Sequence, residues 1–121
     1  MATVRYFVTD VEHAVAFYTK SFDFKVQQQF GPNMAILRLG DLTLWLAGPN
    51  ASAARPMPDG RTPEPGGWNR FVLEVADLSA TVAKLKAEGM RFRNDIVTGP
   101  GGQQILVEDP FGNVMELFQP A

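Results

Sequence analysis

The chain has 121 residues, 45% of them hydrophobic, and a formal net charge of −2 at pH 7. The length suits one compact domain or two half-domains that share a core. The near-neutral charge argues against nucleic acid as a partner, and no apolar run is long enough to cross a membrane. The chain has no cysteine, which excludes disulfides and thiolate metal ligands, and His13 is its one histidine, which excludes a multi-histidine metal site.

The first half predicts a strand, a helix and three further strands. An apolar-rich opening at 4–8 predicts the first strand, and Asp10 is a plausible N-cap for the helix that follows. The apolar residues after this cap have helical spacing: Val11, Val15, Phe17, Tyr18 and Phe22. Strands are expected near 23–30, 34–39 and 42–47.

Proline and glycine are concentrated in residues 49–67, which contain almost no large apolar side chain. This composition is typical of a linker or a mobile lid. We therefore place a first module at 1–48 and a second at 68–121. The sequence leaves open whether the segment between them is ordered.

The second half repeats the order of the first. A strand is expected at 71–75, and Asp77 is the next plausible N-cap, 67 positions after Asp10 (77 − 10). The helix after it has apolar positions at helical spacing: Leu78, Val82 and Leu85. Further strands are expected near 91–97, 103–108 and 113–118.

This repetition predicts an α+β fold with two βαβββ modules in tandem. Each module has an apolar sheet face that its twin would cover. The alternative is a single α+β sandwich without true repetition.

The last stretch, Asp109 to Leu117, predicts a tight turn that feeds a strand. Pro110 has the φ angle that a turn needs at its second position, and Gly112 accepts the positive φ that closes it. The strand after the turn is apolar except for Glu116. A carboxylate in such surroundings is costly unless it is paired or binds something.

The paired modules, the helix carrying Phe17 and Tyr18, and the closing Asp-Pro-x-Gly-Asn-x-x-Glu-Leu resemble the vicinal oxygen chelate superfamily. That superfamily includes glyoxalase I, extradiol dioxygenases, and fosfomycin and bleomycin resistance proteins. The resemblance covers nearly the whole chain outside the linker. It implies a curved mixed sheet around a cleft, a small-molecule ligand and a homodimer.

In metal-using members, each module offers one ligand from its first strand and one from its last. Carried over by the repeat, these positions are Thr3, Trp45, Arg70 and Glu116. Arginine and tryptophan cannot ligate a cation, and a catalytic divalent ion needs about three protein ligands. The resemblance therefore predicts no metal or other cofactor, with Glu116 as the one candidate ligand. In place of the metal we expect a bidentate ion pair between Arg70 and Glu116.

A cleft with Trp45 as a wall and one polar pair has the usual anatomy of a small-molecule site. Tyr6 on the first strand and Trp68 at the start of the second module are further ligand-binding candidates. Trp68 either folds over the cleft or anchors the linker. The alternative is that Arg70 and Glu116 form an ion pair that only stabilises the sheet, and that side chains fill the cleft.

The first functional hypothesis is a metal-free small-molecule-binding protein that resembles bleomycin-binding resistance proteins. The acidic balance, with a sequence pI of about 5.3, favours a cationic ligand. The alternative is a glyoxalase- or dioxygenase-like enzyme, a lyase or oxidoreductase, that uses a divalent metal ion on a small vicinal-oxygen substrate. A third hypothesis is a structural or regulatory module.

Several questions stay open at the level of sequence. No catalytic residue is assigned, and the residues do not decide whether the protein is an enzyme. They also do not identify the ligand, or choose between module pairing within one chain and between two chains. The lack of cysteine and of a signal-peptide pattern at the N-terminus leads us to expect a cytoplasmic protein.

Overall fold

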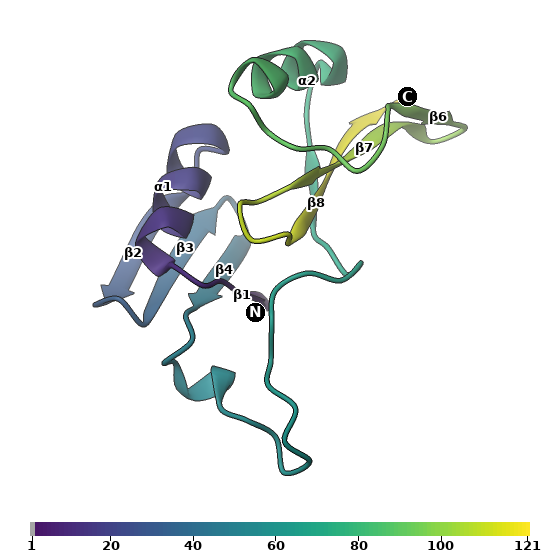
Figure 1. The fold of residues 1–121 in the computed structure, drawn as a ribbon. Coiled ribbons are helices and arrows are strands. Elements are labelled where there is room, and N and C mark those ends of the chain that lie inside the picture. Colours follow the sequence, from purple (N-terminus) through teal and green to yellow (C-terminus); the bar gives the residue numbers. More distant parts are fainter. Residues whose placement is uncertain (1) are drawn as a thin grey trace. The chain divides into compact units, whose positions relative to one another are not determined.

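The computed structural model describes residues 2–121, which divide between Gly66 and Gly67 into two compact units (Figure 1). Each unit is a mixed four-stranded sheet with one α-helix. The two units have the same element order and the same strand order, so the predicted α+β fold of two tandem βαβββ modules is confirmed. Within residues 2–121, no helix is long and apolar enough to span a membrane.

The first unit has its strands in the spatial order β1-β4-β3-β2, with β1 parallel to β4 and the other pairs antiparallel. A 3-10 turn, η1 (Ser52–Ala54), follows the last strand. Its elements are β1 (Thr3–Phe7), α1 (Val11–Ser21), β2 (Lys25–Phe30), β3 (Met34–Leu39) and β4 (Leu42–Ala47).

Helix α1 begins where the sequence predicted, because Asp10 accepts a hydrogen bond from the His13 backbone N–H at 3.0 Å. The helix packs on one face of its sheet (Figure 1). Tyr18 is fully buried there and meets Phe24 edge-to-face, with ring centroids 5.5 Å apart. The other buried residues of this core are Tyr6, Ala35, Leu37, Leu44 and Leu46 on the strands and Val8 just after β1.

The second unit has the strand order β5-β8-β7-β6, again with the first strand parallel to the last. Asp77 caps α2 by accepting from the Ala80 N–H at 3.0 Å, as predicted. Its elements are β5 (Val72–Glu74), α2 (Leu78–Ala87), β6 (Val97–Gly99), β7 (Gly102–Glu108) and β8 (Val114–Pro120).

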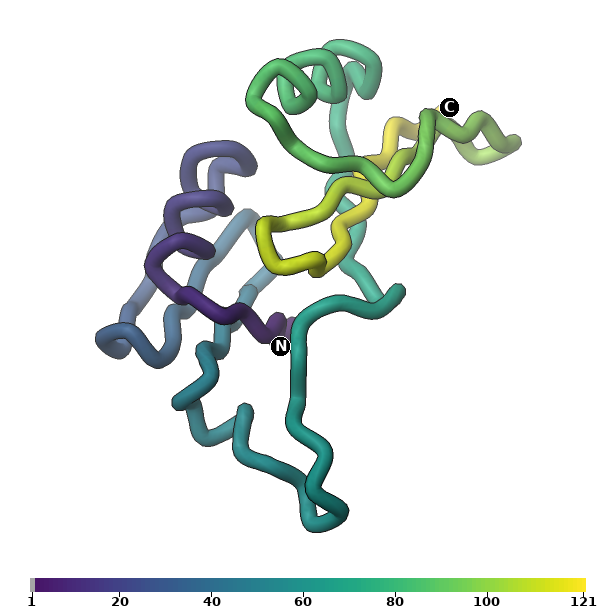
Figure 2. Tube along the Cα trace, in the orientation of Figure 1, coloured from purple at the N-terminus to yellow at the C-terminus, as the bar shows by residue number. Residues whose placement is uncertain are grey.

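Residues 49–66 leave β4 as a long loop with local hydrogen bonds, visible in teal in Figure 2. Met57 N–H donates to the Arg61 carbonyl at 2.7 Å, and Arg61 pairs with Asp59 at 2.8 Å. Ala51 and Ala54 are buried. The role of 49–67 as a linker or lid between modules stays a prediction.

The strand expected at 91–97 is wrong in its extent. Only Val97 to Gly99 form β6, with one isolated bridge between Phe92 and Val107. The ladder fails because the Leu106 N–H donates to the side-chain oxygen of Asn94, at 2.9 Å, where a regular strand would offer a backbone carbonyl. Around that bridge the Arg93 N–H donates to the Leu106 carbonyl at 3.0 Å and the Glu108 N–H to the Arg91 carbonyl at 2.9 Å. Residues 94–96 lie outside the ladder.

Gly102, at the start of β7, is expected to tolerate no side chain. Its φ is +144°, and an added Cβ would fall on the carbonyl oxygen of Gln119. We expect Gly102→Ala to lower the free energy of unfolding in urea by about 1–3 kcal/mol. Gly101, in the same hairpin, has nothing within 4 Å of an added Cβ. Equal urea midpoints for Gly102→Ala and the control Gly101→Ala would contradict this expectation.

Candidate functional site

The face of the first sheet that α1 does not cover carries three rows of side chains. Its residues alternate along each strand with those that face α1, and two of them in β4, Thr43 and Ala47, are also buried. The backbone register joins Arg5, Trp45, Ile36 and Gln28 in one row, Phe7, Ala47, Met34 and Phe30 in the second, and Thr3, Thr43, Arg38 and Lys25 in the third. We call this the open face of the first sheet.

Arg5 and Trp45 are neighbours on this face. The guanidinium carbon of Arg5 lies 4.9 Å from the centroid of the Trp45 ring, a cation–π contact. Both side chains are half-buried, and with Phe30, Met34 and Ile36 they line a groove of about 410 Å³. Asn33, Asn50 and Ser52 add polar groups to its wall. This volume and mixture fall within the range of small-molecule sites.

Thr3 and Tyr6 lie on opposite faces of β1. Thr3 is exposed on the open face, level with Thr43 of β4. Tyr6 is 8% exposed and belongs to the buried set that shares the core with α1. A contact of either residue with a ligand stays a prediction.

In the second unit, Arg70 and Glu116 form the predicted ion pair. Arg70 precedes β5, and Glu116 lies on β8 opposite Val72. The Arg70 Nε donates to Glu116 Oε1 at 3.0 Å and its Nη2 donates to the same oxygen at 2.9 Å. The fork of two parallel bonds that we expected is therefore wrong in detail, because both donors converge on one oxygen.

The second oxygen of Glu116 reaches solvent. Within residues 2–121 Oε2 takes no hydrogen bond, and no side-chain nitrogen or oxygen among them is both buried and unpaired. The Glu116 side chain is nevertheless only 11% exposed, against 30% for Arg70. The carboxylate is thus largely buried, with Arg70 as its ion-pair partner.

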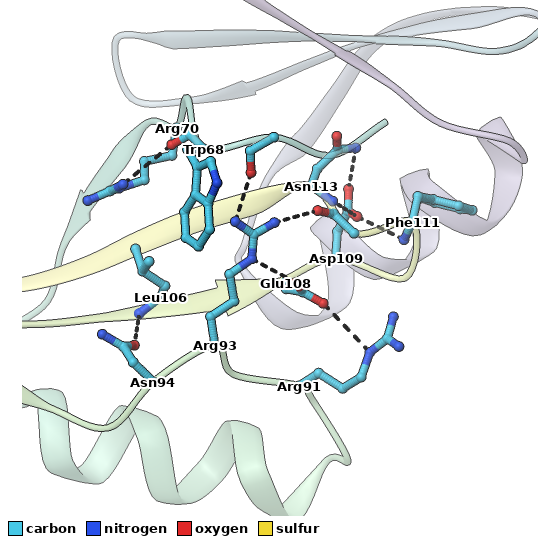
Figure 3. A network of polar contacts seen from close by, with 12 residues as sticks. Trp68, Arg70, Arg91, Arg93, Asn94, Leu106, Glu108, Asp109, Phe111 and Asn113 are labelled. Carbon is cyan, nitrogen blue, oxygen red and sulfur yellow. Dashed lines mark hydrogen bonds and ion pairs between the residues drawn. The ribbon is translucent and has the colours of Figure 1, made fainter. Parts of the chain in front are cut away.

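Trp68 lies against an arginine of its own unit (Figure 3). The residue is 69% exposed, and the Arg93 guanidinium carbon lies 4.6 Å from the centroid of its ring. The Trp68 carbonyl accepts from Arg70 Nη1 at 3.3 Å. Both contacts lie within the second unit, and the two roles considered for Trp68, folding over the cleft or anchoring the linker, stay predictions.

Arg93 joins three segments of the second unit. It donates to Glu108 Oε2 at 2.7 Å, to the Gly67 carbonyl at 2.7 Å and to the Gly112 carbonyl at 2.9 Å (Figure 3). Its side chain is only 16% exposed. Arg93 therefore holds the start of the unit, strand β7 and the closing turn in one arrangement.

The closing turn forms as predicted. The Gly112 N–H donates to the Asp109 carbonyl at 3.2 Å, and Gly112 has a φ of +88°. The buried Asp109 carboxylate accepts from the N–H groups of Phe111 and Asn113, both at 2.9 Å. Asn113 also donates its side-chain amide to Asp109 Oδ2 at 2.9 Å. This network sets the register of β8 and with it the position of Glu116.

The residues at the four positions carried over from metal-using relatives do not have the chemistry of metal ligands. Arg70 places two N–H donors on Glu116, and a donor cannot share that oxygen lone-pair direction with a cation. Trp45 offers no lone pair. Over residues 2–121, no three His, Cys, Asp or Glu side chains gather in a group that could hold a metal ion. Thr3 and Trp45 lie in the first unit and Arg70 and Glu116 in the second.

Comparison with known families decides the affiliation. A family model, the Glyoxalase/Bleomycin resistance protein/Dioxygenase superfamily, matches residues 1–117. The chain belongs to this superfamily. The resemblance predicted from the repeat and the closing motif is thereby confirmed.

Solved structures with the glyoxalase superfamily fold agree over nearly the full chain. A member from Sphaerobacter thermophilus DSM 20745 is 25% identical, with 98% of both chains covered and a TM-score of 0.75. Lactoylglutathione lyase from Agrobacterium tumefaciens is 18% identical, with 98% of this chain and 92% of that chain covered, also at 0.75. The fosfomycin resistance protein FosX from Listeria monocytogenes is 13% identical, with 100% and 93% covered, again at 0.75. A search of curated proteins found no match.

Two arginines of this superfamily member were not among the predicted site residues. Arg5 follows Thr3 by two positions on the same strand, so the period of two could have placed it on the open face. Its contact with Trp45 depends on the pairing of β1 with β4, which the sequence does not state. No pattern in the sequence pointed to Arg93 as a site residue, and its segment was expected to be a regular strand.

Proposed function

We propose that this member of the glyoxalase superfamily binds a small molecule without the metal ion that its metal-using relatives hold. The observation that carries the proposal is the Arg70–Glu116 pair. Glu116 is the one carboxylate among the four carried-over ligand positions, and the Arg70 guanidinium occupies its Oε1 with two hydrogen bonds. A charge-assisted pair of this kind neutralises the carboxylate that a cation would need.

The proposed ligand-binding surface includes the open face of the first sheet. The groove beside Arg5 and Trp45 combines an aromatic wall, aliphatic side chains and a few polar groups. Such a mixture buries a flat ligand and orients it. In the second unit, Arg70, Glu116 and Trp68 are the proposed ligand contacts, because Oε2 of Glu116 takes no hydrogen bond within residues 2–121 and Trp68 is 69% exposed.

A relation to resistance proteins is part of the proposal. FosX, named as a fosfomycin resistance protein, shares this fold at 13% identity, and at that level the likeness concerns the fold alone. We also propose a cytoplasmic homodimer, as the resemblance implies. Sizing chromatography tests the dimer, and a monomer at micromolar concentration would argue against it.

The test of the metal-free function has two measurements. Purified protein is incubated with divalent ions, desalted and analysed for metal by mass spectrometry, and we expect far less than one ion per chain. A thermal-shift screen of antibiotics and aromatic acids, amines and neutral compounds then finds ligands, because a compound that binds only the folded state raises the melting temperature. Binding is expected to be unchanged by EDTA.

The alternative, a metal-dependent glyoxalase- or dioxygenase-like enzyme, predicts the opposite results. One tightly bound ion per chain that disappears in Glu116→Gln would overturn the proposal. Loss of ligand binding in EDTA would do the same. A broad screen without any thermal shift would argue against small-molecule binding altogether.

A further inference from the structure

The open face of the first sheet has a charge opposite to that of the whole chain. The chain carries −2, yet the three rows of this face contain the cations Arg5, Arg38 and Lys25 and no aspartate or glutamate. The local field on a ligand comes from nearby charges, because charges more than about 10 Å away are screened at 0.1 M salt. The expectation of a cationic ligand, drawn from the overall pI, therefore does not hold for this face.

Among the described residues that line the Trp45 groove, Arg5 alone is charged. It lies over the Trp45 ring but forms no ion pair or hydrogen bond with any side chain among residues 2–121. A guanidinium carries its five N–H donors around its edge, and a cation–π contact does not use them up as hydrogen bonds. These donors are available to an anion in the groove.

The rest of the groove favours a flat apolar body. Trp45, Phe30, Met34 and Ile36 provide aromatic, thioether and aliphatic surface. Phe30 is 47% exposed, a large apolar side chain without full cover in its own unit. An aromatic ring laid against this surface gains burial and stacking energy.

Building on the proposed function, we infer that the ligand of this groove is a planar aromatic or conjugated anion, such as an aromatic carboxylate. Its ring lies on the apolar lining beside Trp45, and its carboxylate accepts hydrogen bonds from the edge of the Arg5 guanidinium. Arg5 is thus the residue that selects the charge of the ligand.

The test uses three probes of one shape and different charge: 2-naphthoate, 2-naphthylmethanol and 2-naphthylmethylammonium. Calorimetry measures each dissociation constant, and the two tryptophan indole N–H signals in ¹H–¹⁵N spectra report the place of binding, with Trp68→Phe assigning them. We expect naphthoate to bind about tenfold tighter than the alcohol, the value of one charge-assisted contact. We expect the ammonium to bind weakest and the Trp45 signal to move.

Variants separate Arg5 from the general charge of the face. Arg5→Gln should weaken naphthoate about tenfold and leave the alcohol nearly unchanged, and Arg5→Lys should restore part of the loss. Arg38→Gln removes a cation from the same face, outside the groove lining, and should change naphthoate binding less than about threefold. Urea midpoints check that each variant is folded.

The outcomes are distinguishable. Ammonium binding as tight as naphthoate, an Arg5→Gln protein that keeps full naphthoate affinity, or binding that leaves the Trp45 signal unmoved would overturn the inference while small-molecule binding stands. Failure of all three probes to bind, together with a silent thermal-shift screen, would overturn the inference and the proposed function together.

Discussion

Arg93→Met is expected to lower the free energy of unfolding by about 3–5 kcal/mol, the range for removing one partner of a buried ion pair. Arg93 makes three hydrogen bonds, to Glu108 and to the carbonyls of Gly67 and Gly112. Without it, Glu108, whose side chain is 21% exposed, loses its closest cation, and both carbonyls lose a donor. The aliphatic stem of methionine keeps much of the packing volume, so the loss reports the polar contacts. Urea unfolding followed by circular dichroism measures it.

Arg91 provides the matched control for this prediction. It is two positions away and approaches the other oxygen of the same carboxylate, but at 3.9 Å and with a side chain 68% exposed. Exposed pairs of this geometry contribute about 0–1 kcal/mol. Arg91→Met should therefore unfold almost as the parent protein does. If both variants lost the same stability, net charge and not the Arg93 hydrogen bonds would be responsible.

The second large effect concerns the pair at the candidate site. Arg70→Met is expected to lower the free energy of unfolding by about 2–4 kcal/mol, because it leaves the carboxylate of Glu116, 11% exposed, without a partner. The effect is smaller than that of Arg93 because the Arg70 side chain is 30% exposed and water partly replaces it. Urea midpoints again give the measurement.

A double variant distinguishes a pair kept for binding from one kept for stability. Arg70→Met with Glu116→Leu removes both charges where Val72 and Leu106, the cross-strand neighbours of Glu116, present apolar side chains. Replacing a whole buried pair by apolar residues is often neutral or stabilising, so the double variant should regain most of the stability lost in Arg70→Met. If ligand binding is lost in this stable double variant, the pair serves the site. Full retention of ligand binding would mean that the ion pair serves only the stability of the sheet.

Local features were predictable from the sequence because the interactions that form them span few residues. Asp10 and Asp77 cap helices through N–H groups three positions ahead. Pro110 and Gly112 shape the closing turn through φ angles that the residue types themselves prefer. The repeat was also readable, because both halves follow the same order of periodicities, and the pairing of Arg70 with Glu116 followed from the position of each on its module.

The predictions that were wrong or missing concern residues whose contacts lie far away in the sequence. Residues 91–97 have the composition of a strand, but the Asn94 side chain takes the Leu106 N–H, and that competition is decided only when β7 is in place. Arg93, at the point where the pairing ends, reaches the carbonyls of Gly67 and Gly112, which are 26 and 19 positions away. Residues that are so far apart in the sequence make contact without any periodic pattern of residue types that would predict it.

The sequence by itself determined the module order, the helix starts, the closing turn and the lone carboxylate of the last strand. These depend on backbone preferences and short-range hydrogen bonds that any copy of the segment would have. Only the tertiary structure decided which side chains share a face. The register of β1 against β4 set Arg5 beside Trp45, and that of the whole sheet gathered its cations on the open face of an acidic chain. A shift of one residue in a strand would turn its side chains to the other face, so the charge that a ligand meets depends on the pairing of strands and not on composition.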